Sequence, residues 1–389
     1  MKLIESKAEY IPQATVSSGS PEELLEGIYK MIELAGRTAY HSQDKITPDS
    51  AKNFVDRMIK SKHGAALEHG TVYLMVHTIA PENWDRKIGR QTRLTIDDCR
   101  DDLRTNPTYD KSGEENWWAK EAGHKAHVMA VKYADNPYSK VRIVLTKHEL
   151  NTKGGVILTP TGGIPVIERG AGKVISVFNT ILITTNLRIL VENNWLDDLK
   201  YLCSPTEFHE KRYTMRFTCS RAIAQELTRH RVFSFLMESQ RYINYSKERH
   251  GGEITYIIPS WFEQRTVFLK ESLPNDVVLG AKVSSKINSY NDREMVALKA
   301  LALSERNYMY LLSSGMTPQQ ARDVLPNATK TELIMTGFAS DWRHVMDLRL
   351  FGKTGAPHPD IVALMQKAQK AMQEAGIWED IMSKLSKFK

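Results

Sequence analysis

Fixed positive charges stand directly before a mostly apolar run near the middle of the chain, in the stretch RHRVFSFLMESQR that begins at Arg229 and ends at Arg241. Arginine stays charged at physiological pH and is buried only with an anionic partner. Apolar side chains that favour burial follow at once, at Val232, Phe233, Phe235, Leu236 and Met237. The fold must therefore bury part of this segment while its cations face a cavity or a subunit boundary, where a bound polyanion could neutralise them.

The composition is that of a globular chain with a basic balance. Its 389 residues are 41% hydrophobic and 25% charged, and the formal net charge is +7. This charge favours an anionic partner such as a nucleotide, a nucleic acid or an acidic cofactor, without choosing among them. Residues 1–13 lack the apolar core of a signal peptide, and polar residues interrupt the apolar run from Val174 before it could span a bilayer. We expect a cytoplasmic protein with no membrane partner.

The spacing of cysteine and histidine offers neither a disulfide framework nor a metal site. The three cysteines, Cys99, Cys203 and Cys219, are odd in number and widely spaced. His63 and His69 are six residues apart, a poor spacing for a metal pair, and no carboxylate or cysteine completes a ligand set. We therefore expect a reduced protein without a bound metal.

Local signals at the two ends of the chain predict an α+β fold. Ser20 and Glu23 predict a capped helix that stops at Gly36, and a second helix from about residue 49 to 60 precedes a strand over 71–78. Beyond residue 210, a strand over 212–219 leads into a helix that ends near Arg229. A capping signature over 317–320 opens a short helix that should close before residue 326, and two further helices are expected over 340–350 and 360–382.

Residues 80–210 differ in composition from the rest of the chain and are expected to form a β-rich insertion of hairpins and helices. β-rich runs over 141–146 and from Val174 flank a Gly/Pro/Thr-rich segment, which predicts a hairpin. The sequence GAGKV resembles part of a phosphate loop, but Ile167 and Val174 stand where that motif needs Gly and Ser or Thr. The insertion, which carries Trp117 and Trp118, could cover the active site, extend an oligomer contact or bind another molecule; our default is a structural cover. Residues 1–79 and 211–389 would form the two parts of a catalytic domain.

The chain resembles the flavin-dependent thymidylate synthases, whose signature is RHR, seven residues, Ser, any residue and Arg. Here Arg229 to Arg231 are followed at that spacing by Ser239 and Arg241. Further elements of the same family pattern are matched at Glu68-His69, at Gly36 to Tyr40, at Arg322, at His344 and at Arg349. The resemblance covers roughly residues 20 to 77 and 212 to 352.

This resemblance implies a fold, a reaction and an assembly. The fold would be a core of helices packed on a mostly antiparallel sheet. The reaction would be reductive methylation of deoxyuridine monophosphate (dUMP) at C5 to give dTMP, with FAD as cofactor and with NADPH and methylenetetrahydrofolate as co-substrates. The assembly would be a homotetramer with sites between subunits. Uracil C5 is a weak nucleophile, and a flavin hydride route needs no cysteine thiolate.

The resemblance also implies roles for single residues. FAD would be contacted by Thr71, Arg229, His230, Arg231 and His344. The substrate would be held by Glu226, Arg229, Glu238, Ser239, Gln240, Arg241, Arg322 and Arg349. Among these Arg349 is the expected catalytic residue, because a fixed positive charge at the pyrimidine edge would stabilise the ring as its N3 proton is lost.

Several of these residues also have a purely structural interpretation. Arg229 and Arg231 could pair with carboxylates at a solvated helix end. His344 could be a core histidine, and Thr71 could be ordinary strand surface. Arg322 could be a cation at the C-terminal end of a helix.

The sequence departs from the family pattern at positions near the expected site. Glu226 stands where the family usually has Gln, and Met237 stands where it has Glu or Gln, with Glu238 displaced by one position. Residues 338–340 and 355–360 replace two further family elements, which would affect part of the adenine side of the FAD site that the resemblance implies. Ionised glutamate accepts but does not donate hydrogen bonds, so Glu226 could shift selection toward another pyrimidine nucleotide, such as UMP or dCMP.

Two rival functions remain at the level of sequence. A basic nucleic-acid-binding protein could use Arg229, Arg231 and Arg241 on phosphates and Tyr242 or Tyr245 for stacking. Lys and Arg are spread along the chain among Asp and Glu, which makes a nucleic-acid partner the less favoured interpretation. The other rival is a flavin-binding remnant that has lost catalysis.

Overall fold

The computed structural model of the chain describes most of its residues. They are residues 1–14, 20–79, 94–105, 117–151, 173–248, 251–263 and 292–383. The chain divides into two compact units. The first unit contains Met1–Pro12, Glu33–Ala51 and Arg212–Lys389, and the second contains Gln13–Ile32 and Lys52–Lys211. Among the described residues, no helix combines the length and apolar character needed to cross a membrane.

The first unit is built on a four-stranded sheet in which every neighbouring pair of strands is antiparallel. In sheet order its strands are β2 (Lys7–Ile11), β6 (Arg212–Ser220), β9 (Lys330–Phe338) and β7 (Ser234–Met237). The strand predicted over 212–219 is confirmed as β6, which is buried along nearly its whole length because helices and neighbouring strands cover it. The α+β class with mostly antiparallel sheets is likewise confirmed.

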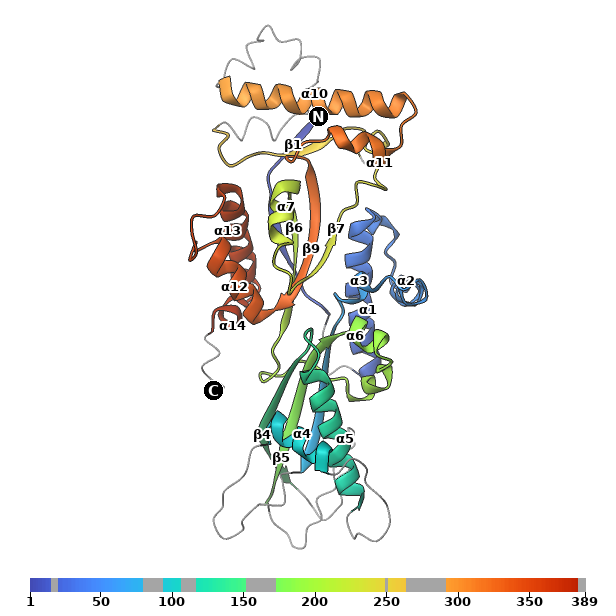
Figure 1. Ribbon diagram of the computed structural model, residues 1–389, viewed down its shortest axis with the longest axis vertical. Helices are drawn as coiled ribbons and strands as arrows, with labels where there is room; N and C mark the ends of the chain where they lie inside the picture. Colours follow the sequence, from blue (N-terminus) through green and yellow to red (C-terminus); the bar gives the residue numbers. More distant parts are fainter. Residues whose placement is uncertain are drawn as a thin grey trace. The chain divides into compact units, whose positions relative to one another are not determined.

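Helices follow the two central strands of this sheet. Helix α7 (Arg221–Leu227) comes directly after β6, and α12 (Ala339–Arg349) comes directly after β9. Figure 1 shows α12 together with α13 (Pro359–Glu374) and α14 (Trp378–Met382) beside β6 and β9. The prediction of one helix over 360–382 is wrong. Helix α13 ends shortly before Gly376, which has φ +70°. The amide of Ile377 donates to the carbonyl of Met372, so a left-handed turn closes the helix.

A glycine lets the apolar run after the arginines enter the core of this unit. Phe233 lies against Gly337 of β9, and its ring is 4.8 Å from that of Trp342, centroid to centroid. The indole of Trp342 is fully buried and donates to the carbonyl of Tyr213 at 3.0 Å. By contrast, Val232 is 60% exposed. The segment is therefore anchored by Phe233 while the residues just before it face outward.

A second apolar cluster of the first unit surrounds two short parallel strands. They are β1 (Lys2–Ile4) and β8 (Thr255–Ile257). The 22-residue helix α10 (Asp292–Ser313) packs on them, with α11 (Pro318–Ala321) and the 3-10 turn η4 (Arg322–Val324) beside it (Figure 1). The capping signature over 317–320 is confirmed, since Thr317 and Gln320 form a capping box, and the short helix ends before Pro326.

The second unit contains a three-stranded antiparallel sheet. Its strands are β3 (Thr71–Ile79), β5 (Lys173–Asn186) and β4 (Lys140–Asn151), with β5 in the middle. The predicted strand and the predicted hairpin are both confirmed. Strand β5 pairs with β3 as well as β4, so the segment expected to be inserted shares a sheet with the segment before it. Gly170, Ala171 and Gly172 of the rejected phosphate-loop sequence lie outside the described residues.

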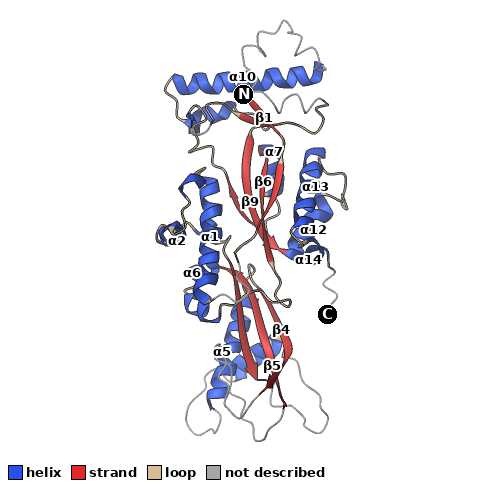
Figure 2. Ribbon diagram, turned by 180° about the vertical axis from the view of Figure 1, so that it is seen from behind, coloured by secondary structure: helices blue, strands red, loops and turns tan. Residues whose placement is uncertain are grey.

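Helices surround this sheet. Figure 2 shows α5 (Trp117–Ala134) along it, and α5 packs against all three strands and against α4 (Ile96–Thr105). The side chains of Trp117 and Trp118 lie outside the described part. The remaining short elements are α3 (Gly64–Leu67), α6 (Leu187–Glu192) and the 3-10 turns η1 (Gln43–Lys45), which belongs to the first unit, and η2 (Leu196–Tyr201).

Helices α1 (Pro21–Ala39) and α2 (Ser50–Lys60) were both predicted. The amide of Glu23 donates to Ser20 Oγ at 3.3 Å, which confirms the cap of α1. The predicted stop at Gly36 is wrong, because the helix continues to Ala39. An interior glycine costs about 1 kcal/mol, and the buried ion pair between Arg37 and Glu33, at 2.7 Å, supports the turn that contains it.

Candidate active site

The arginine motif begins where helix α7 ends. The helix starts at Ser220, whose Oγ accepts from the amide of Ile223 at 3.3 Å. After Leu227 the chain makes a turn in which the amide of His230 donates to the carbonyl of Leu227 at 3.1 Å. The motif therefore begins at the C-terminal end of a helix, as the sequence predicted.

Arg349, the last residue of α12, is held by this turn. Its Nε donates to His230 Nε2 at 3.2 Å, its Nη1 to Glu226 Oε2 at 3.0 Å and its Nη2 to the carbonyl of Glu226 at 3.3 Å. The side chains of Arg349 and Glu226 remain 21% and 31% exposed. A guanidinium has five N–H donors, so two of them have no partner among the described residues and could serve a ligand. Arg349 is thus fixed in direction and still able to bind.

His230 is a neutral group in this arrangement. Because its Nε2 accepts from Arg349, its proton resides on Nδ1. Burial, the charge of Arg349 and the neighbouring His344 lower the pKa of His230 to about 4. The rings of His230 and His344 are nearly perpendicular, with centroids 6.3 Å apart. His344 is exposed, so the interpretation of it as a core histidine is wrong.

Two cations of the motif have no carboxylate partner in the part of the chain that the structure describes. Arg229 and Arg231 are both exposed, and no described carboxylate forms an ion pair with either. The alternative in which they pair with carboxylates at a helix end is therefore not what the described part of the chain shows. Exposed guanidinium groups of this kind can hold a phosphate or pyrophosphate.

The segment after β7 carries the residues expected to hold the nucleotide. Ser239 donates its amide to the carbonyl of Ala39 at 3.0 Å, which brings the predicted Gly36 to Tyr40 element to the motif. The Nε of Arg241 donates to Gln319 Oε1 at 3.3 Å. Gln319 belongs to α11, and Arg322 is the C-cap residue of that helix, half-buried, as the helix-end interpretation expected. Gln240 is 7% exposed.

Glu238 is committed to the protein and buried. It is 3% exposed, and its Oε2 accepts from Lys330 Nζ at 2.9 Å and from the amide of Glu332 at 3.1 Å. The sequence did not indicate Lys330 as a partner, since it lies 92 residues away. The pair fixes the start of the loop that carries Ser239.

Thr71 belongs to the second unit, whereas the other residues of the expected site belong to the first. It is 4% exposed, and its amide donates to Gln13 Oε1 at 2.8 Å while its carbonyl accepts from Gln13 Nε2 at 2.8 Å. Thr71 is therefore not strand surface.

A thiolate nucleophile is not available. Cys219, at the end of β6, is 1% exposed, and burial raises its pKa to about 12. Burial likewise raises the pKa of Cys99 and Cys203 to about 12. Among the residues that the structure describes, no group of three or more His, Cys, Asp or Glu side chains could hold a metal ion.

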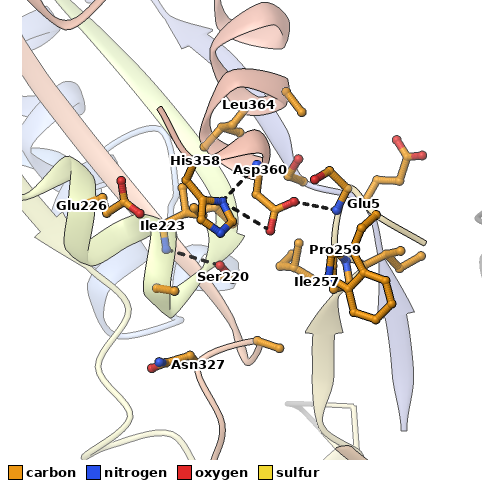
Figure 3. Close-up of a pocket in the computed structure, with 18 of the residues that line it drawn as sticks. Glu5, Ser220, Ile223, Glu226, Ile257, Pro259, Asn327, His358, Asp360 and Leu364 are labelled. Carbon is orange, nitrogen blue, oxygen red and sulfur yellow. Dashed lines mark hydrogen bonds and ion pairs between the residues drawn. The ribbon is translucent and has the colours of Figure 1, made fainter. Parts of the chain in front are cut away.

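A cavity of about 240 Å³ lies beside α7, and Glu226 belongs to its lining (Figure 3). Ser220, Ile223 and Glu226 line it from α7, and His358 and Asp360 line it from the start of α13. Asp360 accepts from the amide of Ser260 at 2.5 Å, and its own amide donates to His358 Nδ1 at 3.1 Å. The segment 355–360, where the sequence departs from the family, therefore lines part of this cavity. The sequence did not indicate this cavity; the proline at position 359, which favours the start of a helix, was the one local signal near it. Phe338 and Ala339, of the other departing segment, are buried.

Comparison with known proteins gives one consistent family. Residues 185–375 match the Thy1 family, described as thymidylate synthase complementing protein. A flavin-dependent thymidylate synthase of Corynebacterium efficiens is 35% identical over 134 residues, covering 33% of this chain and 46% of that protein. The chain spans about half the length of the curated relatives it matches.

The solved structures that match are less similar to this chain in sequence. A UMP/dUMP methylase, PolB, from Streptomyces cacaoi, bound with 5-Br UMP, aligns with a TM-score of 0.32 and 20% identity over 50% of this chain and 79% of that one. Thymidylate synthase X from Helicobacter pylori, with FAD and dUMP, aligns with a TM-score of 0.29 and 19% identity over 44% of this chain and 74% of that one.

Proposed function

Because residues 185–375 form a domain of the Thy1 family, we propose that the chain is a flavin-dependent thymidylate synthase. It would methylate dUMP at C5 to give dTMP, with the one-carbon unit from methylenetetrahydrofolate and electrons from NADPH. The observation that carries the proposal is the fixation of Arg349 by Glu226 and His230, with two donors unused, beside exposed arginines. Such an arrangement suits a polyanionic cofactor and a nucleotide.

The residues around the end of α7 fit FAD. Arg229 and Arg231 would hold its phosphates, because both are exposed and have no described ion-pair partner. His230 would present its neutral Nδ1–H, and exposed His344 would add a further contact. The contact of Thr71 with FAD stays a prediction of the resemblance, since Thr71 is buried in the second unit. FAD, when bound, supplies hydride transfer.

The loop after β7 would hold the nucleotide. Ser239, Gln240 and Arg241 would meet the phosphate, and Arg322 would add a second cation from the end of α11. Glu238, buried and paired with Lys330, would keep this loop in place. This assignment is supported by the hydrogen bond from Arg241 to Gln319, because Gln319 lies in α11, the helix that Arg322 ends.

Arg349 would act on the pyrimidine ring. Uracil C5 is activated either by a thiolate added at C6 or by polarising the ring for a redox partner. The raised pKa of Cys219 argues against the first route. Arg349 would donate its two remaining N–H groups to a ring oxygen and so increase the polarisation of the ring. Its fixed direction means that little reorganisation is needed on binding.

The expected assembly is a homotetramer. An exposed Val232 next to exposed arginines supports a site completed by a neighbouring subunit. Light scattering of the purified protein measures its mass directly, and a stable monomer with full activity would refute this part of the proposal.

The same reaction on UMP or dCMP is the second candidate. The observation that favours it is the contact of Glu226 with Nη1 of Arg349, because an ionised carboxylate accepts hydrogen bonds but does not donate them. Parallel reactions with dUMP, UMP and dCMP at equal concentration compare the three substrates by kcat/KM.

The direct test is product formation. FAD-loaded protein is incubated with dUMP, methylenetetrahydrofolate and NADPH, and dTMP is measured by chromatography, with each component omitted in turn. Product that requires all components and is lost in Arg349→Ala supports the proposal. Flavin binding without product from any pyrimidine nucleotide would mean a flavin-binding remnant. Salt-dependent binding of long nucleic acid without flavin binding would favour the nucleic-acid rival.

A further inference from the structure

Helix α10 carries a second row of apolar residues, on its exposed side. Its buried side, with Leu298 and Tyr308, belongs to the apolar cluster around β1 and β8 (Figure 1). The exposed side presents residues at alternating spacings of four and three positions, here called the α10 row: Val296, Ala300, Leu303, Asn307 and Tyr310. This is the spacing of the contact positions of a coiled coil.

The large side chains of the α10 row line up along the helix axis. Single exposed apolar residues are common on protein surfaces. Here Val296, Leu303 and Tyr310 are seven residues apart, which is close to two helical turns, and they are 69%, 40% and 70% exposed. The helix has 22 residues and is therefore about 33 Å long. A second helix that lay along the row could bury all three side chains in one contact.

The exposed charges beside the α10 row are cations. Arg293, Lys299 and Arg306 are exposed, and none of them pairs with a carboxylate that the structure describes. Glu294 and Glu305 of the same helix are buried. Because the row is flanked by unpaired positive charges, a partner with carboxylates at matching positions would gain favourable interactions at the contact.

We propose that the exposed side of α10 docks an acidic amphipathic helix of another protein, with its apolar positions along the α10 row and its carboxylates beside Lys299 and Arg306. A second copy of α10 would bring further cations to the contact and no exposed carboxylate that the structure describes. A lipid surface would require a broader apolar face than one row. A nucleic acid would match the cations but leave the apolar side chains uncovered.

The test uses a synthetic helical peptide of three heptads, with leucine at the contact positions, glutamate at the flanking positions and a fluorescein label. Repulsion between its glutamates disfavours pairing of the peptide with itself. Fluorescence anisotropy measures its affinity for the purified chain, and the control peptide has lysine in place of glutamate. We expect saturable binding of the acidic peptide, weaker binding at higher salt, and no saturable binding of the basic peptide.

Variants of the α10 row separate this contact from unspecific attraction. Leu303→Asp places a charge at the centre of the row and should weaken binding of the acidic peptide by about tenfold or more. Leu196→Asp is the matched control, because Leu196 is 43% exposed and belongs to the second unit, and it should bind as wild type. The double variant Lys299→Glu/Arg306→Glu should reverse the preference and bind the basic peptide. Circular dichroism confirms that each variant is folded.

Four results would overturn the inference. They are absence of acidic-peptide binding, binding that Leu303→Asp leaves unchanged, an unchanged charge preference in the double variant, and occupation of the row by something else. Sedimentation tests for a second copy, which is the occupant if the mass of the wild-type assembly falls in Leu303→Asp. Anionic phospholipid vesicles that compete with the peptide would identify a lipid surface instead. Because the α10 row contains no residue of the candidate active site, these results leave the proposed function untouched.

Discussion

Replacing Gly337 by alanine should displace the ring that anchors the arginine motif. A Cβ at this position would lie 2.9 Å from Cζ of Phe233 and closer still to two other ring carbons. Carbon atoms in contact are separated by about 3.5 to 4.0 Å, so the ring must move by roughly 1 Å or more. Backbone shifts are restricted because β9 is paired on both sides, with β6 and β7.

The magnitude follows from the packing of this ring. Overpacking a well-filled core costs about 1–3 kcal/mol, and the edge contact between Phe233 and Trp342 contributes about 0.5–1.5 kcal/mol that the shift would weaken. We expect Gly337→Ala to lower the free energy of unfolding by about 2–3 kcal/mol. Arg231 is two residues before Phe233, so the affinity for FAD should fall as well.

Urea unfolding followed by circular dichroism measures the loss, and flavin titration measures the affinity. Phe233→Leu provides space, so adding Gly337→Ala to that variant should cost less than about 0.5 kcal/mol, a coupling that a double-mutant cycle detects. If Gly337→Ala is as stable as the wild-type protein, or if its cost is unchanged with Leu at position 233, the assigned contact is not what holds the motif.

Three further changes test other parts of the structure. Arg349→Lys keeps the charge but loses the fork of donors to Glu226 and His230, so kcat should fall by about 100-fold or more while FAD still binds; unchanged kcat would exclude a catalytic role. Burial lowers the pKa of His209 from 6.5 to about 4. Between these two pH values the unfolded chain binds a proton at His209 and the folded chain does not. The free energy of unfolding should therefore fall by at most about 1.4 kcal/mol per pH unit as the pH drops from about 6.5 to about 4. His209→Gln should remove this contribution, and urea titrations of both proteins at several pH values reveal whether the slopes differ. Gly376→Ala places a Cβ at φ +70° and should lower the free energy of unfolding by about 1 kcal/mol, whereas an unchanged urea midpoint would argue against the left-handed turn.

Elements with strong local signals could be predicted from the sequence. The cap at Ser20, the strand β6 and the short helix α11 depend on residues close together in the chain, which propensity and capping rules describe. The break at Gly376 was missed because an isolated glycine within an apolar periodicity has the same sequence signature whether it interrupts a helix or lies inside one, as Gly36 does.

Helix α10 has no clear apolar stripe, and its residues explain why it was not predicted. Val296, Leu303 and Tyr310 are 69%, 40% and 70% exposed, while Leu298 and Tyr308 are buried. Apolar residues on both faces remove the periodicity that identifies an amphipathic helix. Burial of one face is decided by β1 and β8, which are far away in sequence.

The sequence indicated candidate residues for the site, but it did not indicate which of them contact one another. Motif spacing indicated His230, His344 and Arg349, and these three residues do come together in the structure. The hydrogen bond of Arg349 to Glu226 joins residues 123 positions apart, and no local rule gives such a contact. The pairing of Glu238 with Lys330 and the cavity beside α7 likewise depend on how strands and helices pack.

We propose that the end of α7 and the end of α12 form a flavin and nucleotide site. The most direct measurement is the visible absorbance spectrum of the washed protein after reconstitution with FAD, recorded before and after addition of dUMP. Retained flavin bands that shift with dUMP in the wild-type protein, but not in Arg349→Ala, are the predicted result. A protein that stays colourless after reconstitution would contradict this proposal, and the exposed Arg229 and Arg231 would then need another partner.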